Sequence, residues 1–270
     1  MEEQIVLAVK NTLGLFGLVG ASESFVRWFR GFTPAGQRAN EHRQAMLRFY
    51  SQFIRQGDLC YDVGANLGSR VGIFLKLGAR VVAVEPQERC MRYLRQRFQD
   101  RQRVILIPKG LDEKPGERDL LMANESAVSS MSQEWVHQNE PLGLYRWDKK
   151  AAVPVTTLDN LIQQYGLPTF CKIDVEGFEY HVLKGLSQPL PALSLEYHSD
   201  FLDAVRSSMS HLQTLGRYEF NFSVAETMVL ALAEWLTPDE ICPLLENLPP
   251  ESRAGDIYAR LKKERPFPAS

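Results

Sequence analysis

A short polar turn follows the first apolar segment of the chain, and its residue types suit a charged small ligand. The turn reads Tyr-Asp-Val-Gly-Ala-Asn-Leu-Gly and contains Asp62, Gly64, Asn66 and Gly68. Glycine has no Cβ, so the backbone at Gly64 and Gly68 can pass close to a ligand, and Asn66 tolerates a left-handed conformation. A helix beginning after Gly68 presents free N–H groups to a carboxylate or phosphate, and Asp62 can accept from an ammonium group. The alternative is a plain turn.

An acid ends the next apolar segment, at the spacing of a ribose-binding carboxylate. Glu85 follows the turn by about 20 residues, the distance at which an acid binds both ribose hydroxyls, and Pro86 fixes the chain direction after it. A dinucleotide turn carries a third phosphate glycine, which the spacing Gly64-x-Asn66-x-Gly68 lacks. S-adenosylmethionine carries an amino acid in place of the pyrophosphate, and a turn with Asp and Asn suits that zwitterion better.

A second polar cluster follows the apolar run at residues 169–173. Asp174 and Glu176 come directly after this predicted strand. Two acids at one strand end are costly unless a cationic or hydrogen-bond-donating group lies beside them, so we interpret both as functional. Lys172 shares a strand face with Asp174 and either pairs with an acid or serves the site. Glu179 is interpreted as an acid that stabilises a helix N-terminus.

A histidine and an acid end the following predicted strand, residues 193–197. Glu196 and His198 share one face, so both can reach the same cleft. A histidine beside an acid can be held in one tautomer and act as a base; a surface histidine with an acidic neighbour is the alternative. With Asp174 and Glu176, these groups could also bind a hard divalent cation if the strand ends converge, but no metal is part of the prediction.

These groups must be positioned by strands that alternate with helices. Apolar runs predict strands at residues 59–63, 81–84, 104–107, 169–173, 193–197, 218–222 and 256–261, and helical spacing predicts helices at 43–54, 70–77, 87–98 and 157–165. Such alternation is typical of βαβ units in an α/β, doubly wound and mostly parallel sheet. Ligands of these sheets bind beyond the carboxyl ends of the strands, where the polar turn and the acids lie.

Two segments break this rhythm. Residues 1–57 are predicted to form an N-terminal helical extension before a domain at 58–270, and its helices are a candidate homodimer interface. Within it, residues 5–20 are predicted to form a helix that packs on the main domain, with a membrane-surface or dimer-interface helix as the alternative. Residues 113–155 are predicted to form a hairpin plus an irregular excursion. The aromatic part of that excursion, residues 126–147, is a candidate lid over the site.

Composition limits the function classes. The chain has 270 residues, 44% of them hydrophobic, and a net charge of −2, which excludes disordered and fibrous classes and disfavours non-specific nucleic-acid binding. Its four cysteines contain no Cys-x-x-Cys pair, so we expect reduced thiols in a cytoplasmic protein rather than a zinc site. The N-terminus lacks the features of a signal peptide, and residues 5–20 are too short and polar to span a bilayer.

Taken together, these motifs resemble the FkbM family of methyltransferases. The motifs that carry the resemblance are Tyr61 to Gly68, Val84-Glu85-Pro86, Thr157-Leu158-Asp159, Lys172 to Glu179 and Leu183-Lys184-Gly185. The Lys-Ile-Asp-Val-Glu-Gly block is the specific part, and the similarity covers residues 45–222. The resemblance implies a Rossmann-like class I methyltransferase domain with a seven-stranded sheet, S-adenosyl-L-methionine as cofactor, and O-methylation of natural products or sugars.

The resemblance also assigns roles by position. It implies that the amino-acid end of the cofactor is held by Asp62, Gly64, Asn66 and Gly68, the ribose by Glu85 followed by Pro86, and the adenine by Gly110 and Leu111. Lys109-Gly110-Leu111 departs from the small-residue stretch that is commoner there. Asp174 and Glu176 would face the reacting centre, with Asp174 also beside the cofactor.

The sequence therefore predicts an S-adenosylmethionine-dependent O-methyltransferase that acts on a small hydroxylated acceptor. The predicted base is His198 or Asp174, and Glu176 and Glu196 orient the acceptor. The alternatives are an NAD-dependent oxidoreductase, supported by the same turn and Glu85, and a non-catalytic binding module in a biosynthetic assembly. A nucleic-acid substrate is not expected, because no Asn-Pro-Pro-aromatic motif is present and the arginines of residues 87–98 suit a solvated helix face.

Overall fold

The computed structural model describes residues 34–98, 102–198, 201–249 and 252–262. The chain divides into two compact units, residues 1–49 and 50–270. The described part of the first unit belongs to helix α3 (Pro34–Tyr50), which ends where the second unit begins. The predictions made for residues 1–33, including the dimer or membrane contact, lie outside the described residues.

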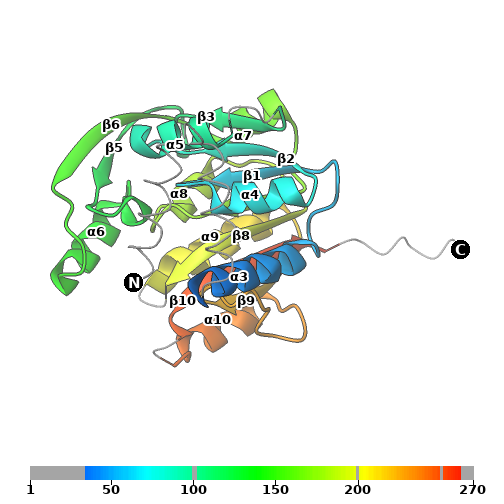
Figure 1. The fold of residues 1–270 in the computed structure, drawn as a ribbon. Helices are drawn as coiled ribbons and strands as arrows, with labels where there is room; N and C mark the ends of the chain where they lie inside the picture. Colours follow the sequence, from blue (N-terminus) through cyan, green and yellow to red (C-terminus); the bar gives the residue numbers. More distant parts are fainter. Residues whose placement is uncertain (1–33, 99–101, 199–200, 250–251, 263–270) are drawn as a thin grey trace, which may run out of the picture. The chain divides into compact units, whose positions relative to one another are not determined.

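A seven-stranded sheet forms the centre of the second unit (Figure 1). Its strands are β1 (Leu59–Val63), β2 (Arg80–Val84), β3 (Val104–Ile107), β7 (Phe170–Ile173), β8 (Ala192–His198), β9 (Tyr218–Val224) and β10 (Ala254–Leu261). Their order is β3-β2-β1-β7-β8-β10-β9, and β10 alone among these seven strands runs in the opposite direction to the other six. The predicted mostly parallel, doubly wound α/β sheet is confirmed.

Helices enclose the sheet. They are α4 (Ser69–Lys76), α5 (Glu88–Phe98), α7 (Leu158–Tyr165), α8 (Glu179–Lys184), α9 (Leu202–Leu215) and α10 (Pro238–Glu246). Apolar side chains of α7 to α10 pack in one core with residues of the central strands. No helix was predicted for the residues of α9 or α10. The helix predicted at 43–54 ends at Tyr50, because the chain then turns and the ring of Phe53 stacks on those of Phe170 and Tyr258.

The opposite face of the central strands is partly polar. In β7 the side chains of Cys171 and Ile173 belong to the apolar core, so Phe170 and Lys172 point to the other face. Lys172 is a register partner of Asp62 in β1 and of Ser194 in β8. Buried polar groups therefore gather on this face of β1, β7 and β8, and they need partners there.

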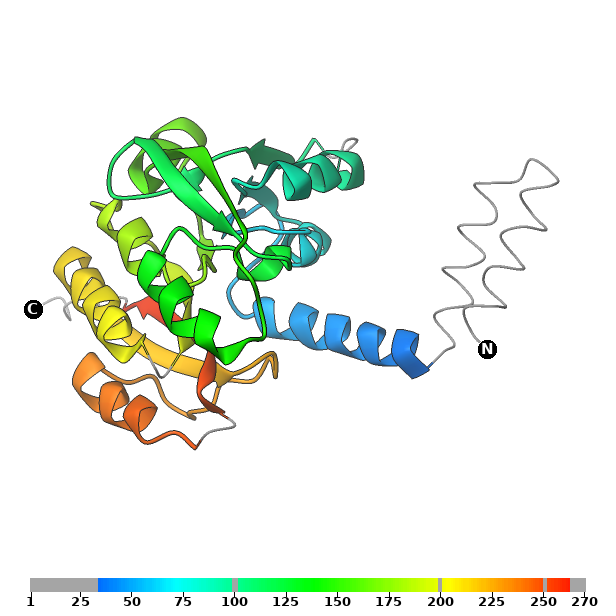
Figure 2. The same cartoon turned by 90° about the vertical axis from the view of Figure 1, so that its left-hand side faces the viewer.

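The segment predicted as a hairpin with an irregular excursion forms a small sheet and a helix. It consists of β4 (Gly110–Leu111), β5 (Gly116–Met122), η1 (Ser126–Val128), α6 (Gln133–Asn139), η2 (Glu140–Leu142) and β6 (Lys149–Thr156). Strands β5 and β6 pair antiparallel, which confirms the hairpin. Figures 1 and 2 show this insert, in green, on one side of the second unit. Gln87 donates to the Ser126 carbonyl at 2.9 Å and Ser130 to the Glu176 carbonyl at 2.6 Å, so the insert lies against the carboxyl ends of β2 and β7.

Two expectations about the whole chain concern thiols and membranes. All four cysteines are free, and three of them are buried, as predicted. Burial raises the pKa of the Cys60 and Cys171 thiols, so both stay protonated and unreactive at neutral pH. Within the described ranges, the helices are too short or too polar to cross a lipid bilayer.

Candidate active site

A cleft opens at the carboxyl ends of β1, β2 and β7, beneath the insert. Eight of the predicted site residues line it: Gly64, Asn66, Glu85, Pro86, Gly110, Leu111, Asp174 and Glu176. Insert residues Ser126, Ser129 and Met131 complete the wall; they belong to the segment 126–147 predicted as a lid, but none was predicted individually as a site residue. Parallel strands end at one edge of the sheet, which brings together motifs that are far apart along the chain.

The turn after β1 needs glycine at its first position. Gly64 has a φ of +82°, and a Cβ built there would overlap the carbonyl oxygen of Asp174. The Asp174 amide in turn donates to the Val63 carbonyl at 3.0 Å, so the two strand ends lie in close contact. Asn66 has a φ of +45°, which confirms the predicted left-handed conformation. The turn thus leaves open backbone at the floor of the cleft.

Asp62 and Gly68 lie behind the turn and outside the cleft lining. Gly68 caps α4, and a Cβ there would come within 2.7 Å of side-chain atoms of Leu94 and Phe98, so its lack of a side chain is explained by helix packing. Asp62 is 2% exposed, and none of the described residues bonds to its Oδ2. Burial raises the pKa of Asp62 to about 6. A buried acceptor beneath the turn fits a ligand ammonium; the cofactor roles of both residues stay predictions.

Glu85 ties the first two strand ends together. Its two carboxylate oxygens accept hydrogen bonds from the backbone amides of Asn66 and Gln87, each at 2.8 Å. Burial raises the pKa of Glu85 to about 7, although these hydrogen bonds act to lower it. Each carboxylate oxygen keeps a further lone pair. The residue is therefore fixed at the cleft wall with acceptor capacity for a ribose diol.

Because the pKa of Glu85 is raised, we expect cofactor affinity to depend on pH. In its predicted role the ionised carboxylate would accept from both ribose hydroxyls, so binding of S-adenosylhomocysteine should weaken as pH falls from about 8 to about 6. Glu85→Gln should bind about 10- to 100-fold more weakly, the effect of losing hydrogen bonds to a charged group, with a flatter pH profile by isothermal titration calorimetry. If the affinity of Glu85→Gln depended on pH as steeply as that of the native protein, this role would be contradicted. The pH dependence would then come from another acid, such as Asp62 or Glu179, whose pKa values are raised to about 6 and about 7.

The free protein should show the opposite trend in stability. A carboxyl whose pKa is raised on folding stabilises the folded state fully below its unfolded pKa of about 4.3, and this contribution is lost as pH rises through about 7. Urea unfolding at several pH values measures it.

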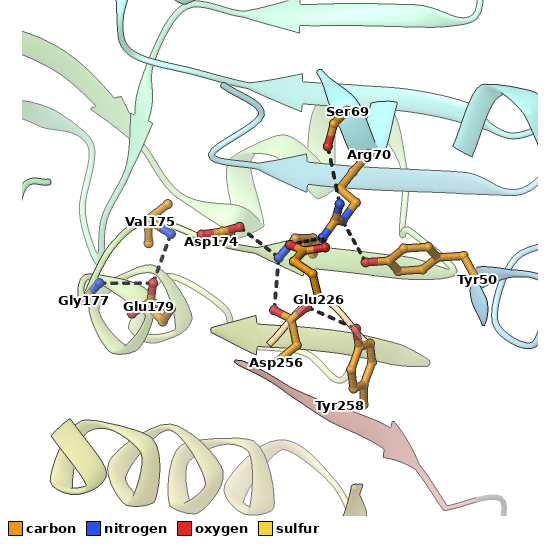
Figure 3. A network of polar contacts seen from close by, with 11 residues as sticks. Tyr50, Ser69, Arg70, Asp174, Val175, Gly177, Glu179, Glu226, Asp256 and Tyr258 are labelled. Carbon is orange, nitrogen blue, oxygen red and sulfur yellow. Dashed lines mark hydrogen bonds and ion pairs between the residues drawn. The ribbon is translucent and has the colours of Figure 1, made fainter. Parts of the chain in front are cut away.

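A buried ion network lies beside the cleft on the polar face of the sheet (Figure 3). The Lys172 ammonium contacts the Asp174 carboxylate at 3.0 Å and the Asp256 carboxylate at 3.1 Å, and Tyr258 donates to the other oxygen of Asp256. Burial acts to lower the pKa of Lys172, but the two carboxylates raise it well above its usual value. The ion-pair interpretation of Lys172 is confirmed, and Asp174 is held in place by a charged partner.

Two further sets of polar contacts lie near this network (Figure 3). The Arg70 guanidinium binds the Glu226 carboxylate at 2.6 Å and donates to the Tyr50 hydroxyl at 3.1 Å.

Glu179, at the start of α8, accepts from the amides of Val175 and Gly177 (Figure 3). The prediction that Glu179 stabilises a helix N-terminus is consistent with these bonds, which also order the backbone on both sides of Glu176.

A second cavity of about 160 Å³ opens on the other side of Glu176. It contains the predicted residues Glu196 and His198 and is walled by the aromatic side chains of Trp135, Tyr145, Tyr180, Tyr197 and Phe201. Trp135 reaches the site because Gly177 has no side chain: a Cβ there would lie 2.5 Å from the indole ring. Glu176 lines both the cleft and this cavity.

Three carboxylates meet where the two spaces adjoin. Oxygens of Asp174, Glu176 and Glu196 all lie within 4.8 Å of one another. Burial, and then the neighbouring acids, raise the pKa of Glu176 and of Glu196 well above the usual value. The two strand ends therefore converge, which was the condition for a shared site of these acids. Such a cluster can hold a proton or a cation.

The fold and the site together define a class of protein. Three features define a class I methyltransferase. The sheet is doubly wound, with the antiparallel strand β10 between β8 and β9; a glycine turn follows the first strand, and an acid follows the second. A family model described as the methyltransferase FkbM domain matches residues 62–222, more than half of the chain. The chain belongs to the FkbM methyltransferase family, and its cofactor is S-adenosyl-L-methionine.

Comparison with solved structures gives distant similarities. A precorrin-6Y C5,15-methyltransferase from Geobacter metallireducens is 11% identical, with 82% of this chain and 86% of that chain covered and a TM-score of 0.44. An S-adenosylmethionine-dependent O-methyltransferase from Thermotoga maritima is 12% identical (83% and 66% covered, TM-score 0.40), and an rRNA methylase from Streptococcus thermophilus is 13% identical (80% and 94%, TM-score 0.40). No curated protein matches the sequence. These similarities identify neither the acceptor nor the atom methylated.

Proposed function

We propose that this methyltransferase acts on a hydroxyl group of a small natural product or sugar. The observation that carries the proposal is the position of Glu176, whose side chain lines both the cofactor cleft and the second cavity. S-adenosylmethionine, when bound, would supply a sulfonium methyl group: the acceptor oxygen would bond to the methyl carbon, and S-adenosylhomocysteine would leave with the electron pair of the broken C–S bond. An alcohol is a weak nucleophile until its proton leaves, so a base at this junction favours O-methylation.

Among the acids of the site, Glu176 suits the role of base best. Asp174 lines the cleft only and is held by Lys172, while His198 lines the second cavity only. Glu176 reaches both spaces, and its raised pKa makes it a stronger base than an exposed glutamate. Glu176 takes the hydroxyl proton as the new C–O bond forms, and Glu196 orients the acceptor. Trp135 covers the junction and excludes water.

The size of the second cavity supports a small acceptor. A cavity of about 150 Å³ holds one benzene ring, and 160 Å³ therefore fits one six-membered ring. This supports a small-molecule substrate over a nucleic acid, together with the net charge of −2. The dimer contact through residues 1–57 and the cytoplasmic location stay predictions from the sequence.

Ligand binding and product analysis test the proposed function. S-adenosylhomocysteine at 100 times its Kd should stabilise the protein by about 2.7 kcal/mol, and NAD should give no thermal shift. Incubation with methyl-labelled S-adenosylmethionine and a panel of hydroxylated acceptors should yield a methyl ether, identified by its resistance to alkali. Stabilisation by NAD alone would favour the oxidoreductase, and label found only on nitrogen or carbon would contradict O-methylation.

A further inference from the structure

The second cavity combines two surfaces of different chemistry. Its walls are aromatic: Trp135 comes from α6, Tyr180 from α8, and Phe201 precedes α9. Its inner end is acidic, because Glu196 of β8 and Glu176 meet there. Flat aromatic faces accommodate a ring and also attract cations.

Among the residues that the structure describes, neither glutamate at the inner end forms an ion pair with a basic side chain. Within the described ranges, no side chain or amide donates a hydrogen bond to the carboxylate of Glu176 or Glu196. The nearby ammonium of Lys172 contacts Asp174 and Asp256 instead. A partly buried carboxylate without an ion-pair partner is costly in free energy. Because both carboxylates line the second cavity, a cationic ligand bound there would remove this cost.

We propose that the acceptor is a ring compound that carries a protonated amine, which binds Glu196 while the ring lies between the aromatic walls and the reacting hydroxyl faces Glu176. This inference rests on the proposed function, because it takes the second cavity as the acceptor site. An ammonium group offers three donors and a positive charge to the Glu196 carboxylate. A neutral ring of the same size leaves the charges uncompensated, and an anionic ring is repelled.

Three ring compounds that differ only in their charged group test this directly: benzylamine, benzyl alcohol and benzoate. Each is titrated by calorimetry into protein saturated with S-adenosylhomocysteine, at about neutral pH, where a primary amine is protonated, and with EDTA present. We expect benzylamine to bind at least about tenfold more tightly than benzyl alcohol, and benzoate to bind most weakly. Equal affinities, a preference for benzoate, or no binding by any of the three would overturn the proposal.

Matched variants locate the selectivity. Glu196→Gln should reduce the preference for benzylamine over benzyl alcohol to less than about threefold, while Glu134→Gln, an exposed acid on α6 beside Trp135, should keep it. If Glu196→Gln kept the preference for benzylamine over benzyl alcohol, the assignment would be contradicted. Displacement of benzylamine by Mg²⁺, added in the absence of EDTA, would also contradict it, because the carboxylates would then form a metal-cation site. Failure of S-adenosylhomocysteine to bind would instead contradict the proposed function, so the two failures are distinguishable.

Discussion

Glu176→Gln is expected to lower kcat for methyl transfer by about 100-fold or more, while S-adenosylhomocysteine binds within a few-fold of its native affinity. A positioned base contributes about 10²- to 10⁴-fold to proton removal, and a neutral amide cannot accept the hydroxyl proton. Gln has the shape of Glu, which matters because Glu176 has a φ of +55° and its carbonyl accepts from Ser130. The fold of the turn should therefore survive the substitution.

The pH profile and a second variant separate this role from a structural one. Because the pKa of Glu176 is raised, native kcat should increase as pH rises through that pKa and then level off, and Glu176→Gln should lose this dependence. His198→Asn, which changes a group that lines only the acceptor cavity, should alter KM more than kcat. A large kcat loss in His198→Asn with Glu176→Gln near native would return the role of base to His198, one of the two groups that the sequence predicted.

The strands that position the site could be predicted because each is a short apolar run with a clear end. The predicted bounds of β1 and β3 match the structure, since Gly64 follows the first strand and charged residues precede both. The convergence of Asp174 with Glu196 was only a condition at the level of sequence; the structure meets it because β7 and β8 are parallel neighbours.

Two helices were missed although local signals exist for both. In α9, Val205, Met209 and Leu212 recur at helical spacing and pack in the core. Helix α10 begins with a capping box in which Thr237 and Glu240 bond each other's backbone. Polar residues between the apolar ones obscured these signals. Because α9 was not predicted, Phe201 and the α9 residues that line the second cavity were not predicted as site residues either.

Other features of the site depend on contacts between distant residues and could not be predicted from sequence. Trp135 reaches the junction because Ser130 bonds the Glu176 carbonyl and Gly177 leaves room for an indole ring. The Lys172–Asp256 pair joins residues 84 positions apart and exists because β10 inserts antiparallel between β8 and β9. No local pattern specifies either contact.

That pair makes Lys172 the position where a single substitution should cost the most stability. Lys172→Met removes the ammonium and leaves the carboxylates of Asp174 and Asp256 without a cationic partner; of the two, the Asp256 side chain is 7% exposed. Breaking a buried pair by removing one partner costs about 3–5 kcal/mol, so the urea midpoint should fall markedly. Lys150→Met is the control: Lys150 also pairs with an aspartate, but both side chains are about half exposed, and such pairs contribute about 0–1 kcal/mol.

A double variant distinguishes an uncompensated charge from lost packing. In Lys172→Met/Asp256→Asn the buried carboxylate becomes a neutral amide to which the Tyr258 hydroxyl can still donate. If the unpaired charge is the cause, the double variant should recover a large part of the lost free energy of unfolding. If the alkyl chain of Lys172 matters instead, the two substitutions should add. An additive result, or a loss no larger than that of Lys150→Met, would show that the network does not stabilise the strand ends, and the position of Asp174 would then need another explanation.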